Sequence, residues 1–133
     1  MIVVDTNLLA YLWIPGEMTE WAEEALRRDA AWASPLLWRS EFRSVLAGYI
    51  RLKRMSLETA LRCLADAEHF MAGREYLVPS DKVMPLVANS RCSAYDCEFV
   101  ALAKDLNLRL VTTDAQLLKE FAAETISLRA FVQ

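Results

Sequence analysis

Short apolar or β-branched runs alternate along the chain with longer stretches in which apolar residues recur at the spacing of amphipathic helices. The runs predict five strands, at residues 2–4, 31–33, 76–78, 108–112 and 125–128. Because helical sequence separates these strands, we expect an α/β fold whose parallel sheet is covered by helices on both faces. A length of 133 residues is that of one domain, so residues 1–133 are expected to form a single unit.

Small polar residues mark the boundaries of several predicted helices. Helix starts are expected at or directly after Thr19, Ser56, Ser80, Ser93 and Asp114. The pair Ser34-Pro35 predicts another start, with Ser34 as the cap and Pro35 in the first turn of a long helix that runs to about Arg51. Asn107 is a residue that commonly ends a helix, and it follows the stretch that begins at Ser93.

Two acidic residues occupy helix positions where the periodicity calls for apolar side chains. Glu41 lies three residues after Trp38 and four before Val45, on the apolar face of its helix. Asp96 lies three residues before Phe99 and also falls on the packed face, in the first turn of its helix. Carboxylates at such positions need a partner, because an unpaired buried charge costs several kcal/mol.

Two further acids each follow an apolar strand. Asp5 ends the run Ile2-Val4, and Asp114 ends the run that begins at Leu108. The carboxyl ends of parallel strands share one edge of the sheet, where ligands bind in open α/β folds. Four carboxylates from separate parts of the chain are therefore expected to converge there, and the hard cations Mg²⁺ and Mn²⁺ prefer such oxygen ligands.

Each of these acids also has an ordinary structural explanation. Asp5 and Asp114 are suited to cap the helices that follow them. Asp96 would favour the helix dipole from a first turn, and Glu41 would pair with a neighbouring arginine at the surface. One metal site accounts for all four acids together, and we prefer it to four separate explanations.

The acids and their flanking residues resemble a known family. The segments VVDTNLLAYL, SEFRSVL, SAYDCEFVALA and LRLVTTDAQLL, in this order, resemble the PIN-domain ribonucleases and most closely the VapC-type toxins of toxin–antitoxin pairs. The resemblance implies a PIN-like domain with a five-stranded parallel sheet in the order 3-2-1-4-5. It also implies that the catalytic, metal-binding acids are Asp5, Glu41, Asp96 and Asp114. The residues that would orient these acids or a bound water are Thr6, Asn7 and Thr113.

The activity implied by the resemblance is metal-dependent hydrolysis of RNA phosphodiester bonds, with Mg²⁺ or Mn²⁺ as the cofactor. His69 is the only histidine and lies outside every motif, so a mechanism with a histidine pair is excluded. A phosphatase of the haloacid-dehalogenase type needs a second Asp two positions after the first, where this chain has Asn7. Two alternatives are kept, a PIN-like nuclease of RNA maturation and a non-catalytic PIN module that binds RNA or protein.

Charge and composition bear on the partners. The net charge of −3 means that RNA would need a local basic surface, and the candidates beside the acids are Arg39, Arg43 and Arg91. The resemblance implies an antitoxin partner and a homodimer, and Trp13 and Trp21 flank a Pro-Gly corner where an exposed apolar surface would suit a partner. Three cysteines without C-x-x-C spacing favour a reducing compartment. With neither a signal peptide nor a membrane span apparent, we expect a cytoplasmic protein.

Overall fold

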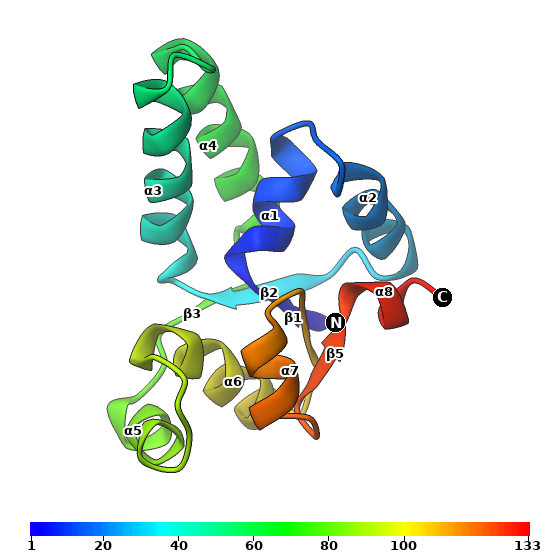
Figure 1. Cartoon of the computed structure of the whole chain (residues 1–133), viewed down its shortest axis with the longest axis vertical. Coiled ribbons are helices and arrows are strands. Elements are labelled where there is room, and N and C mark those ends of the chain that lie inside the picture. Colours follow the sequence, from blue (N-terminus) through cyan, green and yellow to red (C-terminus); the bar gives the residue numbers. More distant parts are fainter.

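A computed structural model describes all residues from 1 to 133. Five parallel strands form one sheet in the order β3-β2-β1-β4-β5, which confirms the expected α/β fold and strand order (Figure 1). The strands are β1 (Ile2–Val4), β2 (Trp32–Pro35), β3 (Glu75–Tyr76), β4 (Leu110–Thr112) and β5 (Thr125–Ser127). Their positions agree with the five apolar runs, although each run differs from its strand by up to two residues at an end, except at β1.

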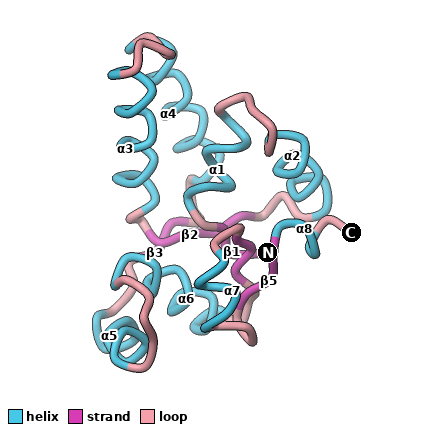
Figure 2. Tube along the Cα trace, in the orientation of Figure 1, coloured by secondary structure: helices cyan, strands magenta, loops and turns pink.

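Helices enclose the sheet as two outer layers (Figure 2). One layer contains α1 (Thr6–Trp13), α2 (Thr19–Arg28), α3 (Trp38–Arg51) and α4 (Leu57–Met71). The other contains α5 (Ser80–Ala88), α6 (Ala94–Leu106) and α7 (Ala115–Glu120). A short helix not expected from the sequence, α8 (Leu128–Phe131), follows β5 and packs against α2. None of these helices is both long and apolar enough to cross a membrane.

The central strand β1 places its carboxyl end in the middle of the sheet edge. All three of its residues are buried, as a strand covered on both faces requires. Val3 pairs with Ala33 of β2 on one side and with Leu110 of β4 on the other. Residues that directly follow β1 and β4 therefore leave the sheet side by side.

The apolar core fills the space between the sheet and both helix layers. Its largest side chains, Trp32, Trp38 and Phe42, are completely buried. Trp13 packs against Phe70 with ring centroids 5.4 Å apart, and Trp21 lies under the guanidinium of Arg129. Both tryptophans are half-buried against the core, so each leaves only part of its ring for a partner, and the predicted apolar docking surface at this corner stays a prediction.

The helix start predicted at Ser34-Pro35 is also wrong, because both residues belong to β2. The backbone N–H of Ser34 donates to the carbonyl of Arg74, next to the neighbouring strand β3, and its hydroxyl donates to the Val4 carbonyl at 2.6 Å. The N–H and the hydroxyl of Ser34 are therefore both occupied by contacts within the sheet, and the hydroxyl does not cap a helix. After a short turn, α3 begins at Trp38.

Other caps agree more closely with the sequence. Ser56 and Ser93 each accept a hydrogen bond from the third backbone N–H of the helix they precede. Asn107 ends α6 in the left-handed conformation, with φ of 54°. Thr19 differs, since it is the first residue of α2 rather than its cap, and its hydroxyl donates to the carbonyl of Tyr11 at 2.8 Å.

Candidate active site

A small acidic pocket lies at the carboxyl end of β1, where α1, α3, α6 and α7 meet. Its volume is about 80 Å³. The four acids singled out in the sequence all line it: Asp5, Glu41, Asp96 and Asp114. Thr6 and Asn7 line it as well, together with the apolar side chains of Phe99 and Leu117. Two strand ends and two helix N-terminal turns therefore bring together acids from four separate parts of the chain, as the sequence predicted.

Asp5 is the most deeply buried of these acids, with 8% of its surface exposed. One carboxylate oxygen accepts a hydrogen bond from the N–H of Leu8 at 3.2 Å, so Asp5 does cap α1. The other oxygen accepts from the hydroxyl of Thr112. Burial, with a smaller contribution from the nearby charge of Asp114, raises the pKa of Asp5 to about 6 against the opposing effect of these hydrogen bonds.

Thr112 connects Asp5 with Asp114. While its hydroxyl donates to Asp5, it accepts from the backbone N–H of Asp114 at 3.0 Å. Asp114 also caps α7 through the N–H of Leu117 at 3.0 Å. Sequence reasoning missed Thr112 and chose Thr113, whose hydroxyl instead lies 3.1 Å from the hydroxyl of Tyr11. The sequence did hold a signal for Thr112: it is the last residue of a buried strand, and that strand lies directly beside the one that Asp5 follows.

Glu41 of α3 and Asp96 of α6 both line the pocket. The hydroxyl of Thr6 donates to a Glu41 oxygen at 2.7 Å, and no arginine pairs with Glu41. Burial raises the pKa of Glu41, and the charge of Asp96 adds to the increase. Burial likewise raises the pKa of Asp96, with a contribution from Asp114. The sequence reasoning missed a fifth acid near this site, Glu98. Burial raises the pKa of Glu98, and the charge of Glu41 adds to the increase, which shows that the two acids are close.

The donor set suits a hard divalent cation. Every charged group in the pocket is a carboxylate, and none of the four pocket acids forms a salt bridge. Burial raises the pKa values of Asp5, Glu41 and Asp96, with a smaller contribution from the negative charge of a neighbouring pocket acid, and a bound cation would offset both effects. No three acidic, histidine or cysteine side chains come close enough to enclose one ion by themselves. Mg²⁺ usually keeps waters and binds through one or two carboxylates plus substrate phosphates, so such an open arrangement fits it.

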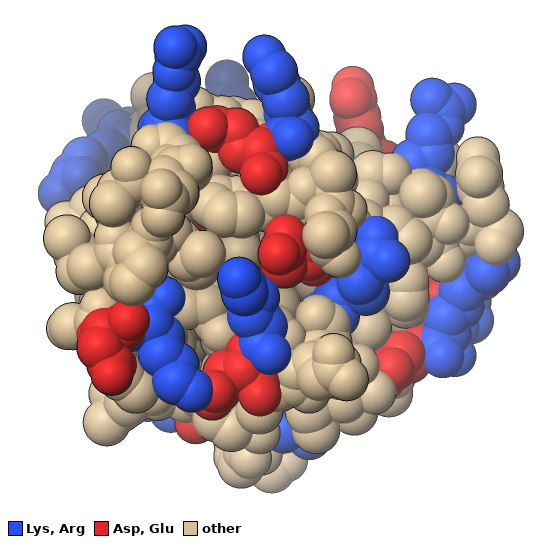
Figure 3. Space-filling view, turned by 90° about the horizontal axis from the view of Figure 1, so that it is seen from below, with Lys and Arg blue, Asp and Glu red and all other residues tan.

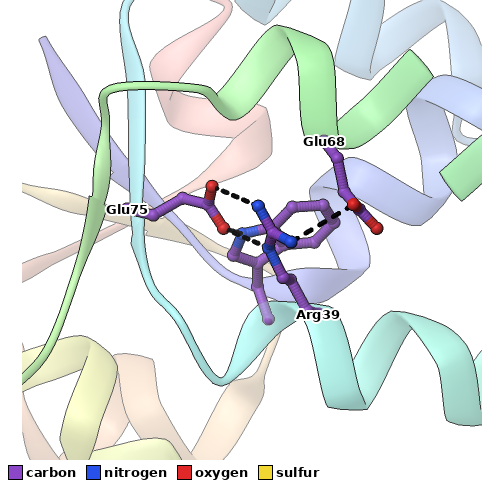
Figure 4. Close-up of polar contacts among 4 residues, drawn as sticks. Arg39, Glu68 and Glu75 are labelled. Carbon is purple, nitrogen blue, oxygen red and sulfur yellow. Dashed lines mark hydrogen bonds and ion pairs between the residues drawn. The ribbon is translucent and has the colours of Figure 1, made fainter. Parts of the chain in front are cut away.

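Arg39 forms ion pairs with two carboxylates. Its guanidinium donates two hydrogen bonds to the Glu75 carboxylate, at 2.6 and 2.8 Å, and a third to Glu68 at 3.2 Å (Figure 4). Trp38 also donates to Glu75, at 2.9 Å. Arg39 does not line the acidic pocket, and its ion pairs link α3, β3 and α4. Its predicted contact with RNA stays a prediction.

The other two arginines of the RNA prediction have free side chains. Arg43 and Arg91 are exposed and form no salt bridge. The backbone of Arg91 is fixed, however, because its N–H donates to Glu120 at 2.8 Å. On the face shown in Figure 3, Lys and Arg side chains are dispersed among Asp and Glu, with no continuous basic patch.

An open parallel sheet in the order 3-2-1-4-5, with an acidic pocket at the end of its central strand, defines an α/β domain with a candidate metal-binding active site. Residues 2–124 match the family model described as the PIN domain, so the chain belongs to the PIN-domain family. Membership implies nuclease chemistry in general and the use of divalent metals. No protein of curated function matches the sequence.

Solved structures share this fold. PAE2754 from Pyrobaculum aerophilum is 21% identical, with a TM-score of 0.77 over 98% of this chain and 92% of that one. FitAcB from Neisseria gonorrhoeae is 18% identical, with a TM-score of 0.73 over 96% of each chain. A toxin–antitoxin complex from Klebsiella pneumoniae contains a chain that is 20% identical, with a TM-score of 0.62 over 96% of this chain and 98% of that one. At these identities the likeness establishes the fold.

Proposed function

We propose that this protein is a metal-dependent endoribonuclease, the toxin of a VapBC-type toxin–antitoxin pair. The observation that carries the proposal is the convergence of four carboxylates, none with a cationic partner, at the end of the central strand of a PIN domain. A protein that used these acids only for stability would pair them with arginine or lysine, as it does for Glu68 and Glu75.

The proposed metal ligands and catalytic acids are Asp5, Glu41, Asp96 and Asp114. Bound Mg²⁺ or Mn²⁺ would supply Lewis acidity and a water of lowered pKa for attack on the phosphodiester, leaving 5′-phosphate and 3′-hydroxyl ends. The chain's own contribution is to hold the acids still: Thr112 fixes Asp5, and Thr6 fixes Glu41. Asn7 is exposed at the pocket and would meet the substrate or a bound water. The exposed guanidinium groups of Arg43 and Arg91 would hold the flanking phosphates.

An antitoxin and a second copy of this chain are the proposed protein partners. The Klebsiella pneumoniae structure with the same fold is a toxin–antitoxin complex, which supports the first of these. Large apolar side chains that remain exposed, among them Leu36, Leu77 and Met84, offer surface for association. Three free cysteines are consistent with the reducing cytoplasm.

The direct test is to incubate the purified protein with total cellular RNA and Mg²⁺ or Mn²⁺ and to map new 5′ ends. Discrete cuts are expected that disappear with EDTA and in Asp96→Asn, a variant that keeps the size of the side chain while removing its charge. Asp66→Asn is the matched control, because Asp66 is an exposed acid of α4 outside the pocket.

RNA that stays equally intact with the wild type and Asp96→Asn, in the absence of any antitoxin, would contradict the nuclease and favour a binding module. Cuts confined to one precursor transcript would favour a role in RNA maturation.

A further inference from the structure

A second hollow adjoins the acidic pocket and has no role in the site described above. Its volume is about 350 Å³, within the range of pockets that hold small organic groups. Asn7 lines both this hollow and the acidic pocket, so the two adjoin at this residue. The hollow lies between α1, α3 and the corner that joins α1 to α2.

Helix geometry explains why the hollow leads away from the acids. On α3, Val45 and Tyr49 follow Glu41 at intervals of four residues, so all three share one face. Each interval advances about 6 Å along the helix. On α1, Tyr11 follows Asn7 at the same interval. The two walls therefore start at the acids and extend together along a single groove, with a tyrosine on each wall.

The groove is held in shape by hydrogen bonds. The Tyr11 hydroxyl lies 3.1 Å from the hydroxyl of Thr113, next to Asp114, which fixes the far end of the aromatic ring. At the corner, Thr19 accepts from the N–H of Gly16 at 2.9 Å and donates to the carbonyl of Tyr11. Because these bonds link α1, the corner and the loop after β4, the groove exists before any ligand arrives.

We propose that this groove, lined by Tyr11, Val45 and Tyr49, is a subsite for one unstacked nucleobase of the RNA, adjacent to the scissile phosphate. Bases of single-stranded RNA are characteristically splayed out and stacked on aromatic side chains, with polar groups reading their edges. Here two tyrosines supply the aromatic walls, and Asn7 and Glu17 supply polar groups at the rim. The carboxylate of Glu17 forms no salt bridge, so it is free to accept from a base N–H.

The inference rests on the proposed ribonuclease and adds a source of sequence preference to it. An antitoxin segment is the competing occupant. The position of the groove beside the acidic pocket favours the nucleobase, because Asn7 lies on both and a strand whose phosphate lies among the acids has its neighbouring base next to the groove. The two tryptophans near the corner do not line this groove, since Trp13 packs against Phe70 and Trp21 lies under Arg129.

The test compares cleavage of a random-sequence RNA pool by the wild type and by groove variants, with every 5′ end sequenced. The wild type should show a base preference at one position beside the cut. Tyr49→Ala should reduce that preference about tenfold, as expected for the loss of one stacking platform, whereas Tyr49→Phe keeps the ring and should retain it. Val45→Trp, which fills the groove, should abolish the preference, while Ile50→Ala truncates a neighbouring side chain of α3 outside the groove and should leave it unchanged.

A second measurement does not depend on cleavage. RNA containing 4-thiouridine is irradiated with the protein in EDTA, and cross-linked peptides are identified by mass spectrometry. Cross-links to Tyr11 or Tyr49 are expected. If they form while no RNA is cut in the separate cleavage assay with Mg²⁺ or Mn²⁺, the ribonuclease proposal fails and the subsite stands as an RNA-binding site. If RNA is cut but neither the cross-links nor an altered preference in Tyr49→Ala and Val45→Trp is found, the subsite is overturned and the groove belongs to another occupant.

Discussion

Thr6 donates a hydrogen bond of 2.7 Å to the carboxylate of Glu41, 35 positions further along the chain. This bond joins the first residue of α1 to the first turn of α3, across the acidic pocket. Thr6 is buried, and Glu41 is the only side chain that its hydroxyl contacts by a hydrogen bond. The bond lowers the pKa of Glu41 against the larger effect of burial, so it favours the charged form that a cation would need.

Replacement of Thr6 by Val tests this bond. Val has a similar shape but no hydroxyl, so Thr6→Val should lower the free energy of unfolding by about 1 kcal/mol. Metal-dependent cleavage should fall as well, because Glu41 loses its orientation and is more easily protonated. Urea denaturation and the cleavage rate measure the two effects. Thr6→Ser keeps the hydroxyl and is the control; equal losses in both variants would mean that packing of the methyl group, not the bond, matters.

Asp5 predicts a distinctive dependence of stability on pH when no metal is present. Its pKa rises from 3.8 to about 6 on folding, so the folded state binds the extra proton and wild-type stability falls as the pH rises through this window. Asp5→Asn cannot ionise. In EDTA it should match the wild type near pH 4 and be more stable near pH 7.5, by up to about 3 kcal/mol.

Urea denaturation at the two pH values checks this expectation for Asp5→Asn. Added Mn²⁺ should reverse the order, because the wild type regains a cationic partner that the variant cannot bind. A variant less stable than the wild type at pH 7.5 in EDTA would show that the hydrogen bonds to Leu8 and Thr112 require the carboxylate itself.

Metal binding should be visible as thermal stabilisation. A ligand that binds only the folded state adds about 2.7 kcal/mol at a concentration one hundred times its dissociation constant. Mn²⁺ should therefore raise the melting temperature of the wild type and have little effect on Asp96→Asn, which loses one of the four pocket carboxylates. Asp66→Asn should respond as the wild type does. The same Mn²⁺ response in all three proteins would place the ion outside the acidic pocket.

The pairing of Arg39 with Glu75 is expected to stabilise the fold rather than bind substrate. The side chain of Glu75 is 12% exposed and accepts from both Arg39 and Trp38. Glu75→Gln should lower the free energy of unfolding by about 1–2 kcal/mol, because the charge-assisted bonds weaken in a partly buried place.

Glu58→Gln is the matched control for Glu75→Gln. Glu58 pairs with Arg62 on an exposed face of α4, with 88% and 67% of the side chains accessible, so its loss should change stability by less than about 0.5 kcal/mol. Both free energies come from urea denaturation. Equal losses of stability in the two variants would mean that the ion pair of Arg39 is an ordinary surface pair. If Glu75→Gln changed the affinity for RNA without changing stability, Arg39 would be assigned to RNA binding instead.

Local signals determined the parts of this protein that depend on neighbouring residues. Alternation of apolar runs with amphipathic stretches determined the α/β class, since burial on two faces requires that pattern. Ser93 and Asn107 marked the two ends of α6, because caps and left-handed residues act within a few positions. Asp5 and Asp114 stood out because each ends a buried strand, and they serve both as helix caps and as pocket residues.

Tertiary structure decided the contacts that depend on distant partners. Ser34-Pro35 has the composition of a helix start, yet pairing with β3 and β1 makes it a strand. Arg39 pairs with Glu75 because β3, which carries Glu75, lies beside β2 in the sheet. The sequence of α3 around Arg39 does not specify this placement of β3. The sequence alone determined which acids could meet at one end of the sheet. Only the packing of α1, α3 and β4 around β1 decided which hydroxyl holds each acid, because register and helix placement depend on the whole core.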